Sequence, residues 1–153
     1  MFHSTEFIVR LIEENKIRFG QLDDSITYRD PCDLGRNSGV FDEPRYIIEK
    51  IPGVDFVELN DCREYSSCCG SGGDLLVSNP DLSLNIARRK VNEVLDTRAR
   101  TLVMACPSCI RSINMMKIAE KAQFEVLDII QLAWKAMIEV RLIAGINSKE
   151  QLW

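Results

Sequence analysis

Apolar residues along the chain alternate between two spacings, one typical of amphipathic helices and the other of short buried strands. The helical spacing recurs at residues 4–18, 42–51, 79–96, 107–122 and about 129–144. Short runs that contain β-branched or aromatic residues fall at 25–30, 54–59, 101–105 and 124–129. The pattern therefore predicts helices and strands in alternation along most of the chain.

This alternation predicts an α/β fold, with a small, mostly parallel sheet, flanking helices and Rossmann-like βαβ units joined by right-handed crossovers. In such a sheet the carboxyl ends of the strands share one edge, and ligands bind there. The chain has 153 residues, of which 46% are hydrophobic. That is enough for one domain with a buried core. We expect a single domain over residues 1–153, with its core motif at about 25–130.

Composition and charge exclude several classes of protein. The net charge is −4 and no basic patch is present, so nucleic acid is not expected as a partner. Apolar stretches are broken by charged residues and are too short to span a membrane. The N-terminal segment lacks the basic region and cleavage site of a secretion signal, which predicts a cytoplasmic location. In a reducing compartment, the six cysteines are expected to bind metal or carry out redox chemistry rather than form structural disulfides.

Five of these cysteines fall where predicted strands end. Cys32 follows the first strand, and the adjacent pair Cys68 and Cys69 lies in the long loop after the second. Cys106 ends the third strand, and Cys109 is three residues further on. Because the loops at the carboxyl ends of parallel strands share an edge, we expect these five thiols to converge there.

The C-x-x-C segment suits thiolates. Cys106 lies at or near a predicted helix N-cap, and Cys109 lies one turn inside the helix. Free backbone amides and the helix dipole stabilise a thiolate at that position. The same motif opens a helix in dithiol oxidoreductases, so by itself it does not establish a metal site.

The run "CCGSGG" suits a polynuclear metal cluster. Two adjacent cysteines form a disulfide with each other only in a strained ring, whereas both can ligate one cluster. The three glycines that follow can take positive φ and turn their amides toward an anion, as in many iron–sulfur sites. These candidate cofactor-binding residues are Gly70, Gly72 and Gly73. Glycine-rich loops also often only turn the chain.

Other candidate residues have simpler interpretations. Cys62 lies outside the pattern and is expected to be a free loop thiol. His3 is the only histidine and is expected to face solvent near the terminus, so the metal site would be made of thiolates alone. Asp30 and Arg36 flank Cys32, and we interpret them as a loop-capping carboxylate and a surface cation.

Four segments together resemble the cysteine-rich CCG domain: "TYRDPCDLGR" (27–36), "DEPRYIIEKIPGV" (42–54), "CCGSGG" (68–73) and "ACPSC" (105–109). That domain occurs in the B and D subunits of heterodisulfide reductase. It also occurs in iron–sulfur subunits of glycolate oxidase, lactate-utilisation and anaerobic glycerol-3-phosphate dehydrogenase complexes. Its cysteines are separated by gaps of thirty-odd residues. Here 35 residues lie between Cys32 and Cys68, and 36 lie between Cys69 and Cys106. The similarity covers about residues 2–130.

The resemblance implies a metal centre. In heterodisulfide reductase this domain holds a non-cubane four-iron cluster ligated by all five motif cysteines, whereas some copies of the domain hold zinc. On that pattern the ligands here would be Cys32, Cys68, Cys69, Cys106 and Cys109. Such a cluster takes electrons and cleaves a disulfide substrate, with the substrate sulfur bound at iron.

The sequence departs from the family in two ways. The family usually has histidines on either side of the first motif cysteine, and here those positions are Arg29 and Asp33. The thiol ligands are unaffected, but an imidazole that could donate a proton on the substrate side is missing. Family proteins also usually carry two such domains, often with a ferredoxin-like domain, whereas this chain has one copy and no ferredoxin-type cysteine run.

Three hypotheses follow. The first is an iron–sulfur redox subunit for electron transfer or disulfide reduction, inactive alone and dependent on a flavin or ferredoxin-type subunit. The second is a zinc-binding assembly module, for which four thiolates suffice, so that the fifth thiol favours a larger cluster. The third is a metal-free dithiol oxidoreductase that uses Cys106 and Cys109.

Overall fold

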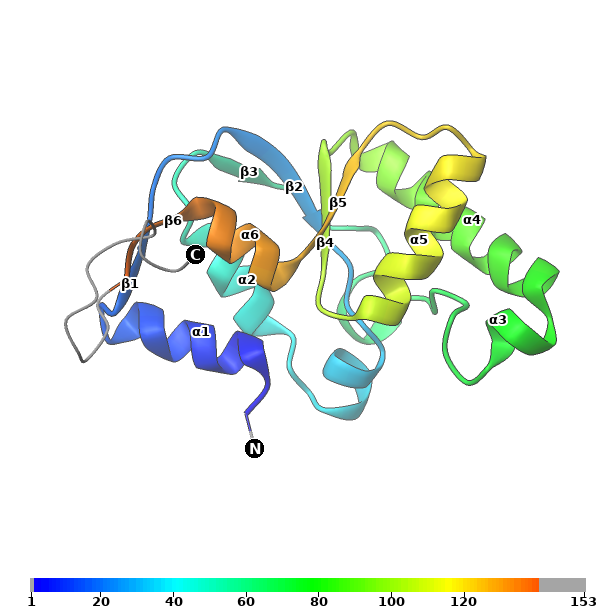
Figure 1. The fold of residues 1–153 in the computed structure, drawn as a ribbon, viewed down its shortest axis with the longest axis horizontal. Coiled ribbons are helices and arrows are strands. Elements are labelled where there is room, and N and C mark those ends of the chain that lie inside the picture. The colour runs from blue at the N-terminus through cyan, green and yellow to red at the C-terminus, as the bar shows by residue number, and fades with distance from the viewer. Residues whose placement is uncertain (1, 141–153) are drawn as a thin grey trace, which may run out of the picture.

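Four parallel strands form the centre of the structure, a computed structural model that describes residues 2–140 (Figure 1). They are β2 (Asp24–Tyr28), β3 (Val54–Phe56), β4 (Thr101–Met104) and β5 (Glu125–Asp128), and their order in the sheet is β3-β2-β4-β5. Every neighbouring pair is parallel, and in the central pair Ile26 lies beside Thr101. The predicted parallel α/β sheet is confirmed.

Helices connect these strands and cover the sheet. They are α1 (Ser4–Glu13), the π-helix η1 (Asp33–Asn37), α2 (Asp42–Glu49), the 3-10 helix η2 (Arg63–Tyr65), α3 (Leu75–Ser78), α4 (Pro80–Thr97), α5 (Pro107–Ala119) and α6 (Ile129–Ala136). A proline is the first residue of both α4 and α5, where its missing N–H costs no helical hydrogen bond. Asn79 caps α4 by accepting the Leu82 amide hydrogen.

The sheet has a buried core on each face because successive residues of a strand point to opposite sides. In β4, Leu102 and Met104 belong to the core formed with α4 and α5, whereas Val103 belongs to the core formed with α2 and α6. Figure 1 shows α1, α2 and α6 on one side of the sheet and α4 and α5 on the other. The fold is thus a three-layer sandwich.

The strand order reverses between β2 and β4. From β2 the chain passes to β3 on one side, then crosses back to β4 and β5 on the other. Loops that leave the carboxyl ends of β2 and β4 therefore diverge, and such a switch point is where open α/β sheets bind ligands.

Two helix predictions need correction at their C-terminal ends. The helix expected at about 129–144 ends at Ala136, and Met137–Val140 form β6, which pairs antiparallel with β1 (Ile17–Phe19). Residues 141–144 of that prediction lie outside the described residues. The helix expected at 4–18 ends at Glu13, and Asn15 then takes a left-handed conformation with φ of 55°. In both cases a strand pairing between distant segments replaces the last helical turn.

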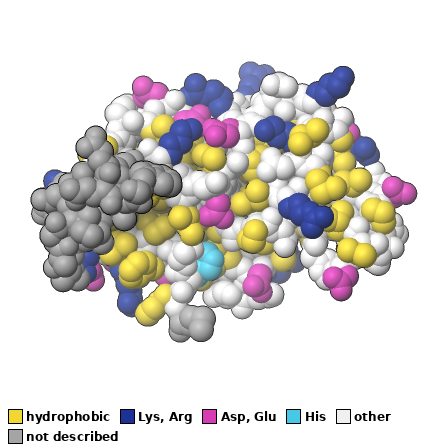
Figure 2. All heavy atoms as spheres, in the orientation of Figure 1, with side chains coloured by type: hydrophobic (Ala, Val, Ile, Leu, Met, Phe, Trp, Pro, Cys, Tyr) yellow, Lys and Arg dark blue, Asp and Glu magenta, His cyan; other side chains and the backbone are white. Residues whose placement is uncertain are grey.

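No membrane-spanning helix is found within residues 2–140, since none is both long enough and apolar enough. On the face shown in Figure 2, charged side chains of both signs are scattered among hydrophobic ones rather than gathered into one charged patch.

Candidate metal centre

The five motif cysteines all lie in segments that follow carboxyl ends of the parallel strands. Cys32 immediately precedes η1, beyond β2, and Cys68 and Cys69 lie in the long connection after β3. Cys106 is the N-cap of α5, directly after β4, and Cys109 lies in the first turn of that helix. The topology therefore brings the cysteine-bearing loops to one end of the sheet, as the sequence predicts.

One thiol contacts two others. The buried Cys109 thiol hydrogen-bonds with the sulfurs of Cys69 and Cys106. Cys32 and Cys68 are exposed, and all six cysteines of the chain are free. Within residues 2–140, no three Cys, His, Asp or Glu side chains are arranged to enclose a single metal ion. The structure therefore shows an inner group of three thiols and two outer thiols at the surface.

A buried arginine lies against the inner group. The side chain of Arg29 is fully buried, and its Nη1 donates to the Cys109 sulfur at 2.8 Å. Its Nη2 donates to the Ser67 carbonyl oxygen at 2.8 Å, while Nε is buried without a hydrogen-bond partner among the described residues. A buried guanidinium beside thiols favours their ionised form and suits a negatively charged, thiolate-ligated group. The donor set thus fits an iron–sulfur cluster.

The thiols of the C-x-x-C segment titrate differently. The hydrogen bond from Cys109, backbone amides at the start of α5 and the charge of Arg29 lower the pKa of Cys106 to about 5, although burial acts in the opposite direction. The pKa of Cys109 is raised, because its proton is shared with Cys106 and Cys69 and because it is buried. Cys106 is therefore a thiolate at neutral pH and Cys109 is a thiol.

This difference predicts a distinct pH profile in the metal-free, reduced protein. The rate at which iodoacetamide alkylates Cys106 should reach half its maximum near pH 5, because the thiolate is the nucleophile. In the urea-unfolded chain the same alkylation rate should reach half its maximum at about pH 8.5, the pKa of an unperturbed thiol. Mass spectrometry of the peptide that contains Cys106 measures both profiles. A folded midpoint above pH 8 would contradict the described geometry.

Two serines hold the glycine-rich loop on the helices below it. Ser83 of α4 donates its hydroxyl hydrogen to the Gly70 carbonyl oxygen at 2.6 Å, and Ser112 of α5 donates to the Cys69 carbonyl oxygen at 2.8 Å. The Gly70 amide in turn donates to the Cys68 sulfur at 3.3 Å. Hydrogen bonds from α4 and α5 thus fix the loop conformation.

Gly70 is the glycine in this loop that the fold most clearly requires. Its φ is +79°, and a Cβ atom there would lie 2.5 Å from the Ser83 carbonyl oxygen. We predict that Gly70→Ala lowers the free energy of unfolding by about 2 kcal/mol or more, from left-handed strain and overpacking together. Gly72→Ala is the matched control, because a Cβ atom there meets nothing within 4 Å. Urea unfolding of both metal-free variants tests this, and equal stabilities would contradict it.

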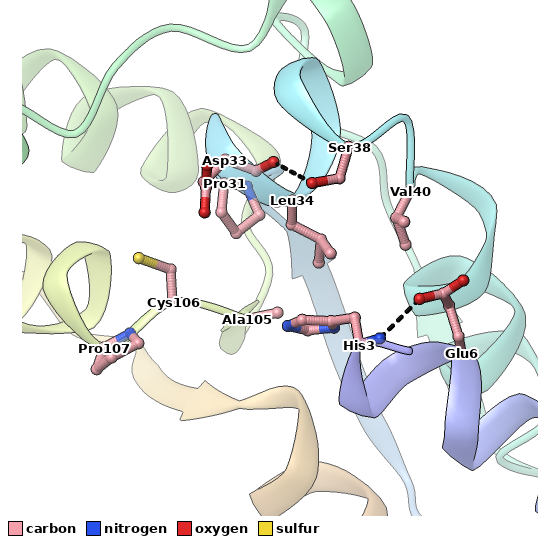
Figure 3. Close-up of a pocket in the computed structure, with 10 residues that line it drawn as sticks. All are labelled: His3, Glu6, Pro31, Asp33, Leu34, Ser38, Val40, Ala105, Cys106 and Pro107. Carbon is pink, nitrogen blue, oxygen red and sulfur yellow. Dashed lines mark hydrogen bonds between the residues drawn. The ribbon is translucent and has the colours of Figure 1, made fainter. Parts of the chain in front are cut away.

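A cavity of about 430 Å³ opens beside Cys106. It is lined by His3, Glu6, Pro31, Asp33, Leu34, Ser38, Val40, Ala105, Cys106 and Pro107 (Figure 3). Figure 3 shows Cys106 and Pro107 on one side of the cavity, across from Pro31, Asp33 and Leu34. The segments on either side of Cys32 and the C-x-x-C segment therefore share a cavity that is partly polar and partly apolar.

His3 corrects one sequence interpretation, because it is half-buried in the wall of this cavity rather than facing solvent as a free terminal residue. It caps α1: its Nδ1 accepts the Thr5 amide hydrogen at 3.3 Å, and its own amide donates to Glu6 at 2.7 Å. With Nδ1 acting as an acceptor, the neutral ring holds its proton on Nε2. The N-terminal position of His3 gave no signal of this placement.

A buried ion pair supports the segment that carries Cys32. Asp30 is 2% exposed and accepts two hydrogen bonds from Arg45, at 2.7 and 2.9 Å. Asp30 also accepts the Arg63 amide hydrogen, which agrees with its expected role in capping a loop. Arg45 pairs on its other side with Glu58. Arg36 is exposed, as expected, but it also donates to the Ser66 carbonyl oxygen at 2.6 Å.

Cys62 lies just before η2, where burial and the neighbouring Glu58 carboxylate raise the pKa of its thiol. These surroundings do not favour a thiolate. Its role as a free loop thiol stays a prediction.

Comparison with known proteins gives a consistent result. A family model described as a cysteine-rich domain, CCG, matches residues 26–114. The chain is 45% identical over 136 residues to the D subunit of the dihydromethanophenazine:CoB–CoM heterodisulfide reductase from Methanosarcina acetivorans, covering 88% of this chain and 33% of that protein. It is 30% identical to the probable iron-sulfur-binding oxidoreductase FadF of Bacillus subtilis, over 95% of this chain and 21% of that protein. With the EtfAB:quinone oxidoreductase of Syntrophomonas wolfei it shares 31% identity, over 90% of this chain and 20% of that protein.

Proposed function

Because the chain belongs to the family of cysteine-rich CCG domains, we propose that it is an iron–sulfur redox domain of a heterodisulfide-reductase-like oxidoreductase. The observation that carries the proposal is the contact of Cys109 with both Cys69 and Cys106 beside the buried cation of Arg29. The chain spans about a third of the length of the heterodisulfide reductase protein that it matches. Activity, substrate and partners of the larger protein are therefore part of the proposal.

The proposed ligands are the five motif cysteines, Cys32, Cys68, Cys69, Cys106 and Cys109. Cys109 already contacts Cys69 and Cys106, and the two exposed thiols can approach the same cluster from the surface. A bound four-iron cluster, proposed to be of the non-cubane type, would supply one-electron redox chemistry at this edge of the sheet. The glycines at positions 70, 72 and 73 let the loop backbone approach it closely.

The cavity beside Cys106 is the proposed route by which a disulfide or thiol substrate reaches the site. Its wall combines apolar residues, among them Leu34 and Val40, with the His3 ring. His3 can hold a proton at Nε2, which supplies in this chain an imidazole that positions 29 and 33 lack.

Electrons must enter and leave through another protein, since one such site has no source of electrons of its own. We propose a flavin or ferredoxin-type subunit as the partner, a cytoplasmic location and no activity of the isolated domain. We also propose that residues 1–153 form a single domain.

Metal and acid-labile sulfide analysis of protein purified without oxygen tests the proposal. About four iron and four sulfide per chain are expected for a four-iron cluster. About one zinc and no sulfide would identify a structural zinc module and would overturn the redox proposal. If neither iron nor sulfide binds after anaerobic reconstitution, the proposal also fails.

A second candidate, a metal-free dithiol oxidoreductase, is favoured by one observation. Cys106 is a partly exposed thiolate, and Cys109 is a buried thiol one helical turn away. In that reaction the Cys106 thiolate attacks a substrate disulfide and Cys109 resolves the mixed disulfide, so the substrate gains two electrons as the Cys106–Cys109 disulfide forms. Reduction of insulin disulfides by reduced metal-free protein, lost on alkylation of Cys106, would support this candidate. No reduction by folded, reduced protein would exclude it.

A further inference from the structure

Arg29 occupies an unusual place for a cation. It follows β2 directly, and its side chain lies on the side of the sheet covered by α4 and α5, where it is 0% exposed. Its hydrogen bonds go to one sulfur and one carbonyl oxygen, at 2.8 Å each, and neither acceptor belongs to a carboxylate. No carboxylate within residues 2–140 forms an ion pair with it.

The contrast with Arg45 shows what is missing. Arg45 is also buried, but Asp30 and Glu58 flank it, so two carboxylates balance its charge. A buried cation without a compensating anion is strongly unfavourable. The side-chain partner of Arg29 is instead a sulfur, that of Cys109, which accepts its hydrogen bond at 2.8 Å.

We infer that Arg29 is a positioning residue that holds the Cys109 sulfur and supplies the positive charge that raises the reduction potential of the metal cluster bound at this site. The inference rests on the proposed iron–sulfur function and assigns a specific task to a residue where the family usually has histidine. Guanidinium differs from imidazole because it stays charged at every physiological pH.

The direction of the effect follows from electrostatics. Accepting one electron adds negative charge to the site, and a buried cation close to the sulfurs stabilises that added charge. Net charge and hydrogen bonds to the sulfurs are among the factors that set iron–sulfur potentials. Removal of Arg29 should therefore make the bound cluster harder to reduce.

A different role must be distinguished, because Arg29 also holds the loop that leads into the cysteine pair. It donates to the Ser67 carbonyl oxygen, and Arg36 donates to the preceding carbonyl oxygen, that of Ser66, at 2.6 Å. Arg36→Met therefore removes one loop contact and one positive charge without removing a contact to sulfur. It is the matched control for Arg29→Met.

The experiment compares the wild-type chain with Arg29→Met, Arg29→Lys and Arg36→Met. Each is reconstituted with iron and sulfide without oxygen and then titrated with dithionite and mediators while its electron paramagnetic resonance or visible spectrum is recorded. At the wild-type midpoint, the ratio of reduced to oxidised Arg29→Met protein should be at least about tenfold lower, a shift of about 59 mV for one electron. Arg29→Lys and Arg36→Met should each stay within about threefold of wild type, about 30 mV on the same scale.

Several outcomes would overturn the inference. One is an unchanged midpoint in folded Arg29→Met protein, and another is an equal shift in Arg36→Met. Arg29→Met protein that folds but takes up no cluster is informative only beside Arg29→Lys. If Arg29→Lys does not restore cluster uptake, the positive charge is not the property that matters, and the inference fails. If Arg29→Met fails to fold, Arg29→Gln takes its place in the comparison. If neither variant folds, an Arg29→Lys midpoint potential that differs from the wild-type value by more than about 30 mV overturns the inference. If the wild-type protein takes up no cluster, the proposed function and this inference both fail. If the Arg29→Met midpoint potential is unchanged, only the inference fails.

Discussion

Cys68→Ser and Cys69→Ser should each lower iron binding at least tenfold, with sulfide lost in parallel. Both residues are proposed ligands, and even changes to groups that only orient ligands cost about 10–100-fold in metal affinity. The two variants differ in what they do to the fold. Cys69 is buried against Cys109, whereas Cys68 is exposed and, within residues 2–140, accepts a hydrogen bond from the Gly70 amide alone, at 3.3 Å.

Cys68→Ser is for that reason the more informative of the two variants. The metal-free protein should keep wild-type stability, so that loss of iron reports ligation and not unfolding. Iron and sulfide analysis beside circular dichroism makes this distinction, and Cys62→Ser, which should retain both elements, is the control. A tetrahedral zinc site needs four ligands and would tolerate one of the two substitutions. Retention of full iron and sulfide by Cys68→Ser would contradict the five-ligand proposal.

Arg45→Met should lower the free energy of unfolding by about 3–5 kcal/mol, because it leaves the buried Asp30 carboxylate without its cation. Asp30 is 2% exposed, and Arg45 binds both of its oxygens. The same guanidinium also holds Glu58 and the Phe41 carbonyl oxygen. One substitution thus removes contacts among α2, the segment after β2 and the segment after β3.

Urea unfolding of metal-free, reduced protein measures this loss. Arg88→Met is the matched control, because its ion pair with Glu120 is exposed, at 46% and 37% for the two side chains. Exposed pairs contribute about 0–1 kcal/mol. A loss below about 1 kcal/mol for Arg45→Met would mean that Asp30 is rehydrated or finds another partner in the variant.

Much of the fold could be predicted from the sequence because its signals are local. The apolar runs at 101–105 and 124–129 mark β4 and β5 closely, and Pro107 marks the start of α5. The predicted final helix was wrong over residues 137–140 because the pairing of β6 with β1 joins segments more than a hundred residues apart. A periodic pattern contains no information on such a pairing. The end of α1 did have a local signal, Asn15, since asparagine tolerates the left-handed conformation that ends helices.

The candidate site could be predicted in part. Strand order brings Cys69 to Cys109 and Cys106, which are three of the five thiols that the sequence predicted would converge. It did not anticipate Arg29, whose position was noted only as a departure from the family. Alternation along β2 sends Tyr28 to one core and Arg29 toward the cysteines, so the strand pattern contained the signal. His3 could not be found this way, because its place depends on how α1 packs.

The strand order also has a consequence for synthesis on the ribosome. Arg29 and Cys109 are separated by 80 positions, and they meet only after β4 has inserted beside β2. A nascent chain therefore emerges with Arg29 and the Cys68–Cys69 pair long before the sulfurs of α5 leave the exit tunnel. A cluster that uses all five proposed ligands can form only after residue 109 has emerged, and we expect chains arrested before residue 109 to retain no iron.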